Sequence, residues 1–373
     1  MVSTSKDSSP PTCSNISRNL SNLHVVFYAN ASSTIGAGHV MRLLAIAQTF
    51  INRGIKVTFA SCECPDYLQD RLQQEGFEFV LLPTNFTDVN IKSLNPNVLV
   101  IDDYNVQAQQ WQYFVAADAL LVNVDDDTHQ QPLLSSIIIN PSASASKQRY
   151  KKRAPGAMLC LGPEFTLLRQ EFMQQAYTNL NQRKKILITL GGADVKNMSY
   201  VLALSLLKRV SNSTQIQVLL GGLHSSGAKA LQELRQQYSN LHIVEQSQNV
   251  AQIMMQSGLA ISAAGGTLGE LASMGTPAIA LVSADNQQAV FTSPHADTWY
   301  SVVDVRQYNG HSDSNNIVSL NTHFNTQLIE KITTQADELW RDLCKRERMS
   351  NQARQLIDGL GCRRIVEHVL SAL

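Results

Sequence analysis

The sequence predicts an α/β protein of two lobes, each built on a parallel sheet with helices on both faces. Three observations lead to this fold class. The chain has 373 residues, and because one hydrophobic core stops growing at about 250–300 residues, two domains of about 150 to 180 residues each are expected. Short apolar runs of strand length alternate with stretches of helical periodicity. This alternation restarts after a polar segment near residues 176–184.

The first series of elements begins at residue 24. The run HVVFYAN (24–30) predicts a strand, and VMRLLAIAQTFINRG (40–54) has helical spacing and ends on a glycine that suits a helix C-cap. KVTFAS (56–61) predicts the next strand and CPDYLQDRLQQEG (64–76) the next helix. Further apolar runs of strand length occupy residues 77–83, 97–104, 119–126 and 135–141. Strands that alternate with helices form βαβ units, and these build a parallel sheet covered on both faces.

The second series follows QRKK at residues 182–185. It predicts a strand at 241–246, and strands together with the glycine turn or loop that follows each at 185–194, 216–222, 259–267 and 277–287. Helices are predicted at 199–210, 227–238, 249–258 and 268–275. The stretch 337–370 is helical with one interruption at 358–361, and its pattern fits packing on either lobe. We expect a disordered extension (1–22), an N-terminal Rossmann-like domain (23–180) and a C-terminal Rossmann-like domain that includes the terminal helices (181–373).

Composition and charge exclude several classes of protein. Apolar residues make up 44% of the chain and charged residues 16%, which is typical of a folded protein rather than a disordered one. Thirty basic residues balance thirty acidic ones. A protein that neutralises many phosphates carries a basic surplus, so we expect no nucleic-acid partner. A small anionic ligand needs only a few local donors and remains compatible with a neutral chain.

The cysteines and the N-terminal residues indicate the cellular compartment of the protein. Six cysteines are scattered, and the one close pair, Cys62 and Cys64, lacks the second pair that a zinc site needs. We expect structural or incidental thiols in a reducing compartment. The N-terminal residues are polar and rich in Pro and Ser, without the apolar run of a signal peptide, and no stretch has eighteen consecutive apolar residues. A cytoplasmic protein without a membrane partner is expected.

The candidate site of the first lobe is the loop between the first strand and the first helix. Ligands of such sheets bind beyond the carboxyl ends of the strands. In residues 31–39, Gly36 and Gly38 allow close approach of backbone to ligand, and His39 opens the helix. From position alone, His39 is equally compatible with a catalytic role and with a local helix cap. The phosphate-loop pattern G-x-x-x-x-G-K-[ST] does not occur, which argues against a P-loop ATPase.

The second lobe has glycine turns after three of its predicted strands, at Gly191-Gly192, Gly221-Gly222 and Gly265-Gly266. The third turn is followed by Thr267 at a helix start, where amide donors and the helix dipole favour a diphosphate. Glu270 fits two interpretations, the acidic half of a capping box with Thr267 or an acceptor for a ribose diol. Asn286 and Gln287 follow the next strand and add polar groups at the same sheet edge.

Two clusters of aspartates are further candidate sites. Asp102 and Asp103 precede Tyr104 at the end of an apolar run, and this pair fits either a magnesium site or a turn. Three aspartates at 125–127, with His129, fit a solvated loop at least as well as a metal site.

With these motifs in place, the chain resembles a known family, the UDP-2,4-diacetamido-2,4,6-trideoxy-β-L-altropyranose hydrolases of pseudaminic acid biosynthesis. These enzymes are relatives of the GT-B glycosyltransferase that makes lipid II. The resemblance implies a GT-B fold, in which two Rossmann-like domains face each other across a cleft. It is carried by seven segments in order: ASSTIGAGHVMR (31–42), IDDY (101–104), LGPEFTLLRQEF (161–172), LGGADVKN (190–197), SAAGGTLGELASMGTP (262–277), SADNQ (283–287) and IDGLGCRRI (357–365).

The resemblance also implies an activity and roles for residues. The sugar nucleotide is cleaved at its anomeric C–O bond with inversion, without a metal or an organic cofactor. His39 is the expected general base or water-positioning group, which suits an imidazole near neutral pH. Tyr104 and Asn286 are expected to contact the sugar or the water. The remaining expected substrate-binding residues, most of them around UDP, are Gly36, Gly38, Arg42, Gly191, Gly192, Asn197, Gly265, Gly266, Thr267, Glu270 and Gln287.

One departure from the family pattern keeps other functions open. The family reads Arg-x-Asp-Ala where this chain has Tyr28, Ala29, Asn30 and Ala31. A glycosyltransferase that uses a UDP-amino sugar is one alternative, and it calls for an apolar or basic acceptor face. A UDP-sugar 2-epimerase is another, although its motifs do not include GAGHVMR. A catalytically silent sugar-nucleotide binding protein predicts UDP binding without turnover. The sequence does not determine the oligomeric state.

Overall fold

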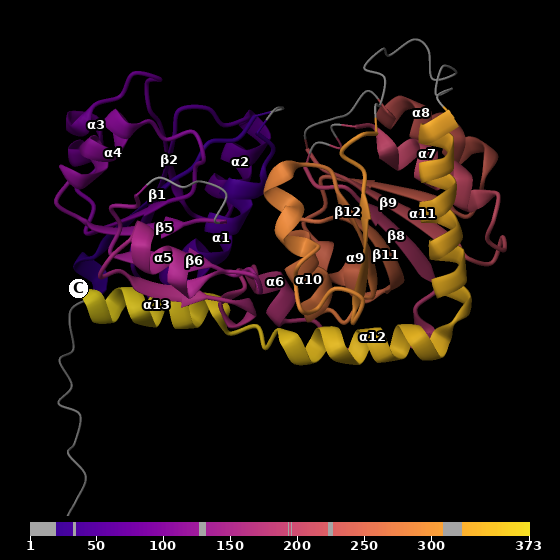
Figure 1. The fold of residues 1–373 in the computed structure, drawn as a ribbon. Coiled ribbons are helices and arrows are strands. Elements are labelled where there is room, and N and C mark those ends of the chain that lie inside the picture. The colour runs from indigo at the N-terminus through magenta and orange to yellow at the C-terminus, as the bar shows by residue number, and fades with distance from the viewer. Residues whose placement is uncertain are drawn as a thin grey trace, which may run out of the picture.

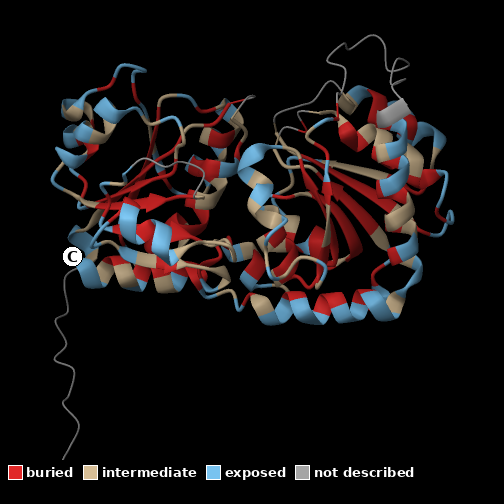
Figure 2. Ribbon diagram, viewed as in Figure 1, coloured by how far each residue is buried: buried red, intermediate tan, exposed pale blue. Residues whose placement is uncertain are grey.

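A computed structural model describes residues 20–32, 35–126, 132–192, 194, 196–222, 227–308 and 323–373. The chain forms two α/β lobes side by side, each with helices around one sheet (Figure 1). The paired strands of both sheets are parallel. The central strands of both sheets are buried (Figure 2). The fold class predicted from the alternating pattern is therefore confirmed.

The first sheet has seven strands: β1 (His24–Tyr28), β2 (Lys56–Ser61), β3 (Glu78–Leu81), β4 (Val98–Ile101), β5 (Leu120–Val124), β6 (Ile137–Asn140) and β7 (Met158–Leu161). Their order is β3-β2-β1-β4-β5-β6-β7. The helical segments of this lobe are η1 (Leu20–Asn22), α1 (Gly38–Ile51), α2 (Asp66–Gln74), α3 (Asp88–Ser93), α4 (Ala108–Val115), α5 (Lys147–Arg153) and η2 (Pro163–Phe165). Because β1 lies between β2 and β4, the strand order reverses beside β1, which is where ligands of such sheets bind.

The second sheet has six strands: β8 (Lys185–Thr189), β9 (Gln215–Leu220), β10 (Leu241–Glu245), β11 (Ser257–Ala263), β12 (Ala278–Val282) and β13 (Tyr300–Asp304). Their order is β10-β9-β8-β11-β12-β13, so the reversal lies beside β8. The lobe also contains α7 (Met198–Leu207), α8 (Gly227–Gln237), α9 (Val250–Met255), α10 (Thr267–Ser273), η4 (Asp285–Val290), α11 (His323–Arg341) and α12 (Leu343–Leu356). Two short segments, α6 (Gln170–Met173) and η3 (Leu180–Gln182), lie on the connection between the lobes.

The structure adds two strands that the sequence pattern did not predict. β7 has four residues, MLCL, and β13 has five, YSVVD, and each forms one edge of its sheet. The predicted disordered extension also ends earlier than expected, because Leu20–Asn22 form the 3₁₀ helix η1. Residues 1–19 of that extension lie outside the described residues.

The last helix, α13 (Gly361–Ala372), packs on the first lobe. α12 runs under the second lobe, and α13 continues under the first (Figure 1). Cys362, Ile365, Val366 and Val369 are buried in the core around β1 and α1. The expectation that all the terminal helices belong to the domain 181–373 therefore fails for α13. An apolar stripe on a helix requires a partner surface but does not specify which one.

None of the described helices has both the length and the apolar character required to span a membrane.

The docking of α13 predicts a stability effect in the first lobe. Ile365 is fully buried, and truncating such a residue to Ala costs about 2–5 kcal/mol. Ile365→Ala should therefore lower the free energy of unfolding of the first lobe by that amount in urea titration. Arg363→Ala on the exposed face of the same helix should change it by less than about 0.5 kcal/mol. Equal effects of the two substitutions would contradict this packing.

Candidate active site

The first lobe brings His39 and Asp102 together at the carboxyl ends of neighbouring strands. His39 is the second residue of α1, which follows the loop after β1, and Asp102 directly follows β4. β1 and β4 are paired, with Tyr28 opposite Ile101, so the two following loops meet. Nδ1 of His39 lies 2.6 Å from Oδ1 of Asp102. Asp102 is 0% exposed and His39 7% exposed, so the pair is shielded from bulk water.

Arg42 holds the Asp102 carboxylate from the other side. It lies three residues after His39, and residues at this spacing share a helix face. Nε of Arg42 donates to Oδ2 of Asp102 at 2.9 Å, and Nη2 donates to Oδ1 at 2.7 Å. Burial alone would raise the pKa of Asp102, but Arg42 and His39 lower it below its ordinary value. Asp102 is therefore an ionised, buried carboxylate at neutral pH.

This arrangement determines the tautomer of His39. Nδ1 also lies 3.1 Å from Nη2 of Arg42, but a guanidinium can only donate and an ionised carboxylate can only accept. The shorter contact is to the carboxylate, so Nδ1–H donates to Asp102 and Nε2 keeps the lone pair. An aspartate that orients a histidine in this way leaves Nε2 as the ring nitrogen that can accept a proton, on the side away from the acid.

Tyr104 lies against the same histidine. Its ring centroid is 4.4 Å from that of His39, with an interplanar angle of 79°. Its hydroxyl accepts a hydrogen bond from Nη2 of Arg42 at 3.2 Å. Burial raises the pKa of Tyr104 above its ordinary value, so the phenol stays protonated at neutral pH. The structure thus gathers three of the candidate residues, His39, Arg42 and Tyr104, around Asp102.

From the sequence, Asp102 is compatible with a turn or with a magnesium site. Both of its oxygens are bound by protein side chains, and neither interpretation includes the role that the structure gives it. The available signal was its position, because an acid directly after a strand next to β1 must lie near the β1–α1 loop. Only the strand order showed that β4 is that neighbour.

The first glycine turn of the second lobe contacts the loop that leads into His39, and the second glycine turn contacts the first. Gly191 has φ +86°, which only glycine adopts readily. A Cβ atom on Gly192 would lie 3.3 Å from Cβ and from the backbone nitrogen of Ala37, two residues before His39. A Cβ atom on Gly221 would lie 2.3 Å from the carbonyl oxygen of Gly192. The loops after β1, β8 and β9 are therefore in contact, and the carboxyl ends of the two sheets face each other.

The third glycine turn opens α10. Space is free around Gly266, where an added Cβ would meet nothing within 4 Å. The side-chain amide nitrogen of Gln287 lies 3.9 Å from the Cβ position of Gly265, while its oxygen accepts from the backbone nitrogen of Ser283 at 2.8 Å. Gln287 therefore directs donors toward this turn. Asn286 is exposed in η4, and no hydrogen bond among the described residues joins it to His39 or Tyr104.

Glu270 does not form the capping box that was one of its two interpretations. The residue before α10 is Gly266, and this helix has no side-chain cap from Thr267. Instead, Oε1 of Glu270 accepts from Nη2 of Arg169 at 2.9 Å, and Arg169 also pairs with Glu171 at 2.7 Å. Arg169 is buried in the connection between the lobes. Oε2 of Glu270 has no hydrogen-bond partner within the described chain, which leaves it available to a ligand.

The segment LGGADVKN contains a helix cap that the sequence analysis missed. Asn197 stands before α7 with φ +52°. The carboxylate of Asp194 accepts from the backbone nitrogens of Met198 and Ser199, each at 3.0 Å. An acidic side chain just ahead of a helix was the available signal. Asp194 therefore fixes the start of α7, while Ala193 and Val195 of the motif lie outside the described residues.

Asp125, the first residue of the second cluster of aspartates, has a structural role. Asp125 is buried and accepts from the hydroxyl of Tyr150 at 2.5 Å and from Nη1 of Arg153 at 2.8 Å. This ion pair ties α5 to the end of β5. Asp127 and His129 lie outside the described residues. Within the described ranges, no three His, Cys, Asp or Glu side chains are placed to hold a metal ion.

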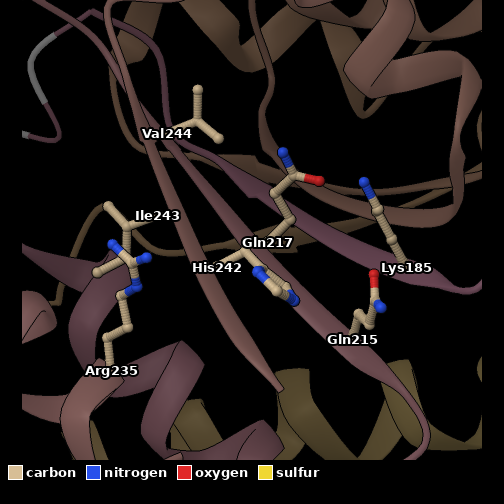
Figure 3. Close-up of a pocket in the computed structure, with 7 residues that line it drawn as sticks. All are labelled: Lys185, Gln215, Gln217, Arg235, His242, Ile243 and Val244. Carbon is tan, nitrogen blue, oxygen red and sulfur yellow. The ribbon is translucent and has the colours of Figure 1, made fainter. Parts of the chain in front are cut away.

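A pocket of about 230 Å³ lies at the other end of the second sheet (Figure 3). Three of its residues begin strands or lie next to a strand start: Lys185 in β8, Gln215 in β9 and His242 in β10. It is therefore remote from the glycine turns, which follow the carboxyl ends of the strands. None of the candidate residues lines it.

Two parallel α/β lobes with facing carboxyl ends define the GT-B fold, and comparisons with known proteins agree. Residues 178–294 match the glycosyltransferase family 28 C-terminal domain. MurG of Acinetobacter baumannii is similar in structure, with a TM-score of 0.58 at 14% identity over 94% of this chain and 99% of that one. UDP-GlcNAc 2-epimerase of Neisseria meningitidis gives a TM-score of 0.57 at 16% identity, with the same coverage.

Two relatives are similar in sequence as well. The chain is 25% identical over 273 residues to the UDP-2,4-diacetamido-2,4,6-trideoxy-β-L-altropyranose hydrolase of Campylobacter jejuni, over 72% of this chain and 95% of the relative. It is 23% identical to the spore coat polysaccharide biosynthesis protein SpsG of Bacillus subtilis, over 72% of this chain and 79% of the relative. The resemblance drawn from the seven sequence segments is confirmed.

The buried Asp102 predicts a pH-dependent stability difference. Asp102→Asn leaves Arg42 without its counter-charge, and such a loss costs roughly 3–5 kcal/mol. Because the folded-state pKa of Asp102 is lowered, its stabilisation is complete above the unfolded value of about 3.9 and is lost as pH falls through the folded value. Urea unfolding of wild type and variant should differ most at pH 7 and converge at acid pH.

The exposed Asp70→Asn serves as the matched control and should show no comparable difference at pH 7. A constant gap between wild type and Asp102→Asn down to acid pH would contradict the ionised Asp102.

Proposed function

We propose that this protein hydrolyses a UDP-linked diacetamido trideoxy sugar at its anomeric C–O bond, releasing UDP and the free sugar. The observation that carries the proposal is the Asp102-oriented His39 at the start of α1, directly after a loop that contacts the Gly192 turn of the opposite lobe. The name of the Campylobacter jejuni relative supports the substrate class. The family 28 domain match supports nucleotide-sugar binding by the second lobe.

The proposed reaction requires one proton transfer. Nε2 of His39 takes a proton from water as the water oxygen bonds to the anomeric carbon. The bond between that carbon and the β-phosphate oxygen breaks, and its electron pair leaves with UDP. The ionised Asp102 stabilises the imidazolium that forms, and Arg42 keeps Asp102 in place. Attack on the face opposite UDP inverts the anomeric centre.

The second lobe is proposed to hold UDP. The open turn at Gly265-Gly266 and the first turn of α10 offer backbone amides to a diphosphate. Donors fixed before the reaction stabilise the charge that develops on the leaving group. Oε2 of Glu270 is proposed to accept from the ribose diol, while Oε1 stays with Arg169. Tyr104 and Asn286 are proposed to contact the sugar or the water.

Replacing His39 tests the base. His39→Ala should lower the rate of UDP release from UDP-2,4-diacetamido-2,4,6-trideoxy-β-L-altrose by roughly a hundredfold or more, because a positioned base contributes about 10²–10⁴-fold. Release is measured with EDTA present and no acceptor. UDP binding, measured by calorimetry, should change little.

His242→Ala is the matched control, since His242 lines the remote pocket, and it should retain the wild-type rate. Wild-type protein that binds UDP but releases none from this substrate would refute the hydrolase proposal.

The ribose contact is tested with a matched pair of ligands. The wild type should bind UDP roughly ten- to a hundredfold more tightly than 2′-deoxy-UDP, because one hydrogen bond to a charged group contributes about 1.5–3 kcal/mol. Glu270→Gln should reduce this discrimination, and calorimetry measures both affinities. Glu171→Gln, which changes the other partner of Arg169, is the control and should preserve it. Unchanged discrimination in Glu270→Gln would exclude the diol contact.

A glycosyltransferase is the second candidate, favoured by one observation in the first lobe. A groove of about 600 Å³ lies beside β7 and α5, with basic Lys147 and Lys151 next to apolar Leu159 and Leu161. This combines the basic and apolar character that an acceptor face requires, and the match to a glycosyltransferase domain agrees with it. Release of UDP that depends on an added acceptor would favour transfer over hydrolysis.

A further inference from the structure

The side chain of Asn30 forms hydrogen bonds to two further loops beside the candidate active site. It stands two residues after β1, and its Oδ1 accepts from the backbone nitrogens of Cys62 and Glu63 at 2.8 and 3.1 Å and from Oγ of Ser61 at 3.1 Å. Its Nδ2 donates to Oδ2 of Asp103 at 2.6 Å. One carboxamide therefore joins the loops that follow β1, β2 and β4.

The hydrogen bonds of Asn30 require an amide side chain at this position. The three groups around Oδ1 are donors, so that atom must be an acceptor. Asp103 is a carboxylate, so the atom facing it must donate. Tyr28 is also within reach of Nδ2, at 3.3 Å from its hydroxyl oxygen. Asparagine meets both requirements with one planar group, whereas aspartate at this position would set two carboxylates against each other.

The contact with Asp103 extends to the catalytic pair through a short stretch of backbone. Asp103 is the next residue after Asp102, and its Oδ1 accepts from the backbone nitrogen of Asn105 at 2.8 Å. The backbone nitrogen of Asp102 donates to the carbonyl oxygen of Tyr28 at 3.0 Å. Residues 102–105 are thus tied to β1 by one backbone bond and by the side chain of Asn30. The side chain of Asn30 therefore adds a contact at Asp103 to those that Arg42 and His39 make with Asp102.

We propose that Asn30 is a positioning residue that fixes the loop bearing Asp102 and Tyr104 under His39, and that it requires an amide at its Asp103-facing atom. The proposal rests on the hydrolysis proposed above for its kinetic readout. It explains why Tyr28 and Asn30 occur together, since the buried Tyr28 offers Asn30 a neutral neighbour instead of a charge.

The groups that face Asp103 define its electrostatic surroundings. They are the Asn30 amide from the end of β1, Tyr28 from β1, Cys62 from the β2 end, His39 from α1 and Asp102 from its own loop. Burial raises the pKa of Asp103, although Asn30 and the Asn105 backbone oppose this. A second carboxylate placed beside it would share a proton with it, as close carboxylate pairs do.

The test is a pH profile of Asn30→Asp. At low pH a shared proton can replace the lost donor, whereas at high pH the two carboxylates repel. The ratio of variant to wild-type kcat for UDP release should therefore fall by on the order of tenfold or more between pH 5.5 and 9. The melting temperature of the variant relative to wild type should fall over the same range. Asn351→Asp, the same exchange at an exposed position of α12, should show neither trend.

The reciprocal variant keeps the proposal testable if Asn30→Asp does not fold. In Asn30→Asp/Asp103→Asn, the donor and the acceptor exchange places and the net charge is unchanged, so kcat should return to within a few-fold of wild type at every pH. A flat ratio for Asn30→Asp, or a double variant that stays as impaired as the single one, would overturn the proposal.

Failure of this inference and failure of the proposed function remain distinguishable. Wild-type protein without UDP release refutes the hydrolysis alone, and the melting temperatures still report on the Asn30–Asp103 contact. Wild-type release with no pH trend in either readout of Asn30→Asp refutes the positioning role alone.

Discussion

The candidate active site depends on one buried carboxylate, that of Asp102. It has no contact with bulk water, and a charge in such a place is tolerated only when it is paired and hydrogen-bonded. Arg42 supplies the opposite charge in a two-point contact, and His39 supplies a third hydrogen bond. The same contacts fix the direction of the imidazole. The stability of this part of the protein and its proposed chemistry therefore depend on the same atoms.

The fold places this cluster where the two lobes meet. The reversal of strand order beside β1 sets the loops after β1 and β4 next to each other, and the reversal beside β8 does the same for the glycine turns of the second lobe. Close contact requires small residues, as Gly192 against Ala37 and Gly222 against the ring of Tyr67 show. The proposed base and the proposed diphosphate site therefore lie on opposite lobes. The chain then returns to the first lobe through α13, which joins the two halves a second time.

The departure from the family pattern at Tyr28 and Asn30 acquires a physical interpretation in this setting. In the sequence, the absence of the family's arginine and aspartate at these two positions leaves the identity of the sugar undetermined. In the structure, Asn30 accepts from the loop after β2 and donates to the loop after β4. A neutral amide and a neutral phenol thus stand beside the Asp102 cluster, so the local charge is carried by Asp102, Asp103 and Arg42.

The sequence by itself determined the two-lobed α/β fold, the position of most strands, and the candidates His39, Tyr104 and the glycine turns. Periodicity and turn chemistry are local properties, so a single chain segment reveals them. The tertiary structure decided that Asp102 is the partner of His39, that Arg169 pairs with Glu270, and that α13 belongs to the first lobe. Each of these joins elements far apart in the chain, and its outcome depends on strand order and helix docking, which local patterns do not encode.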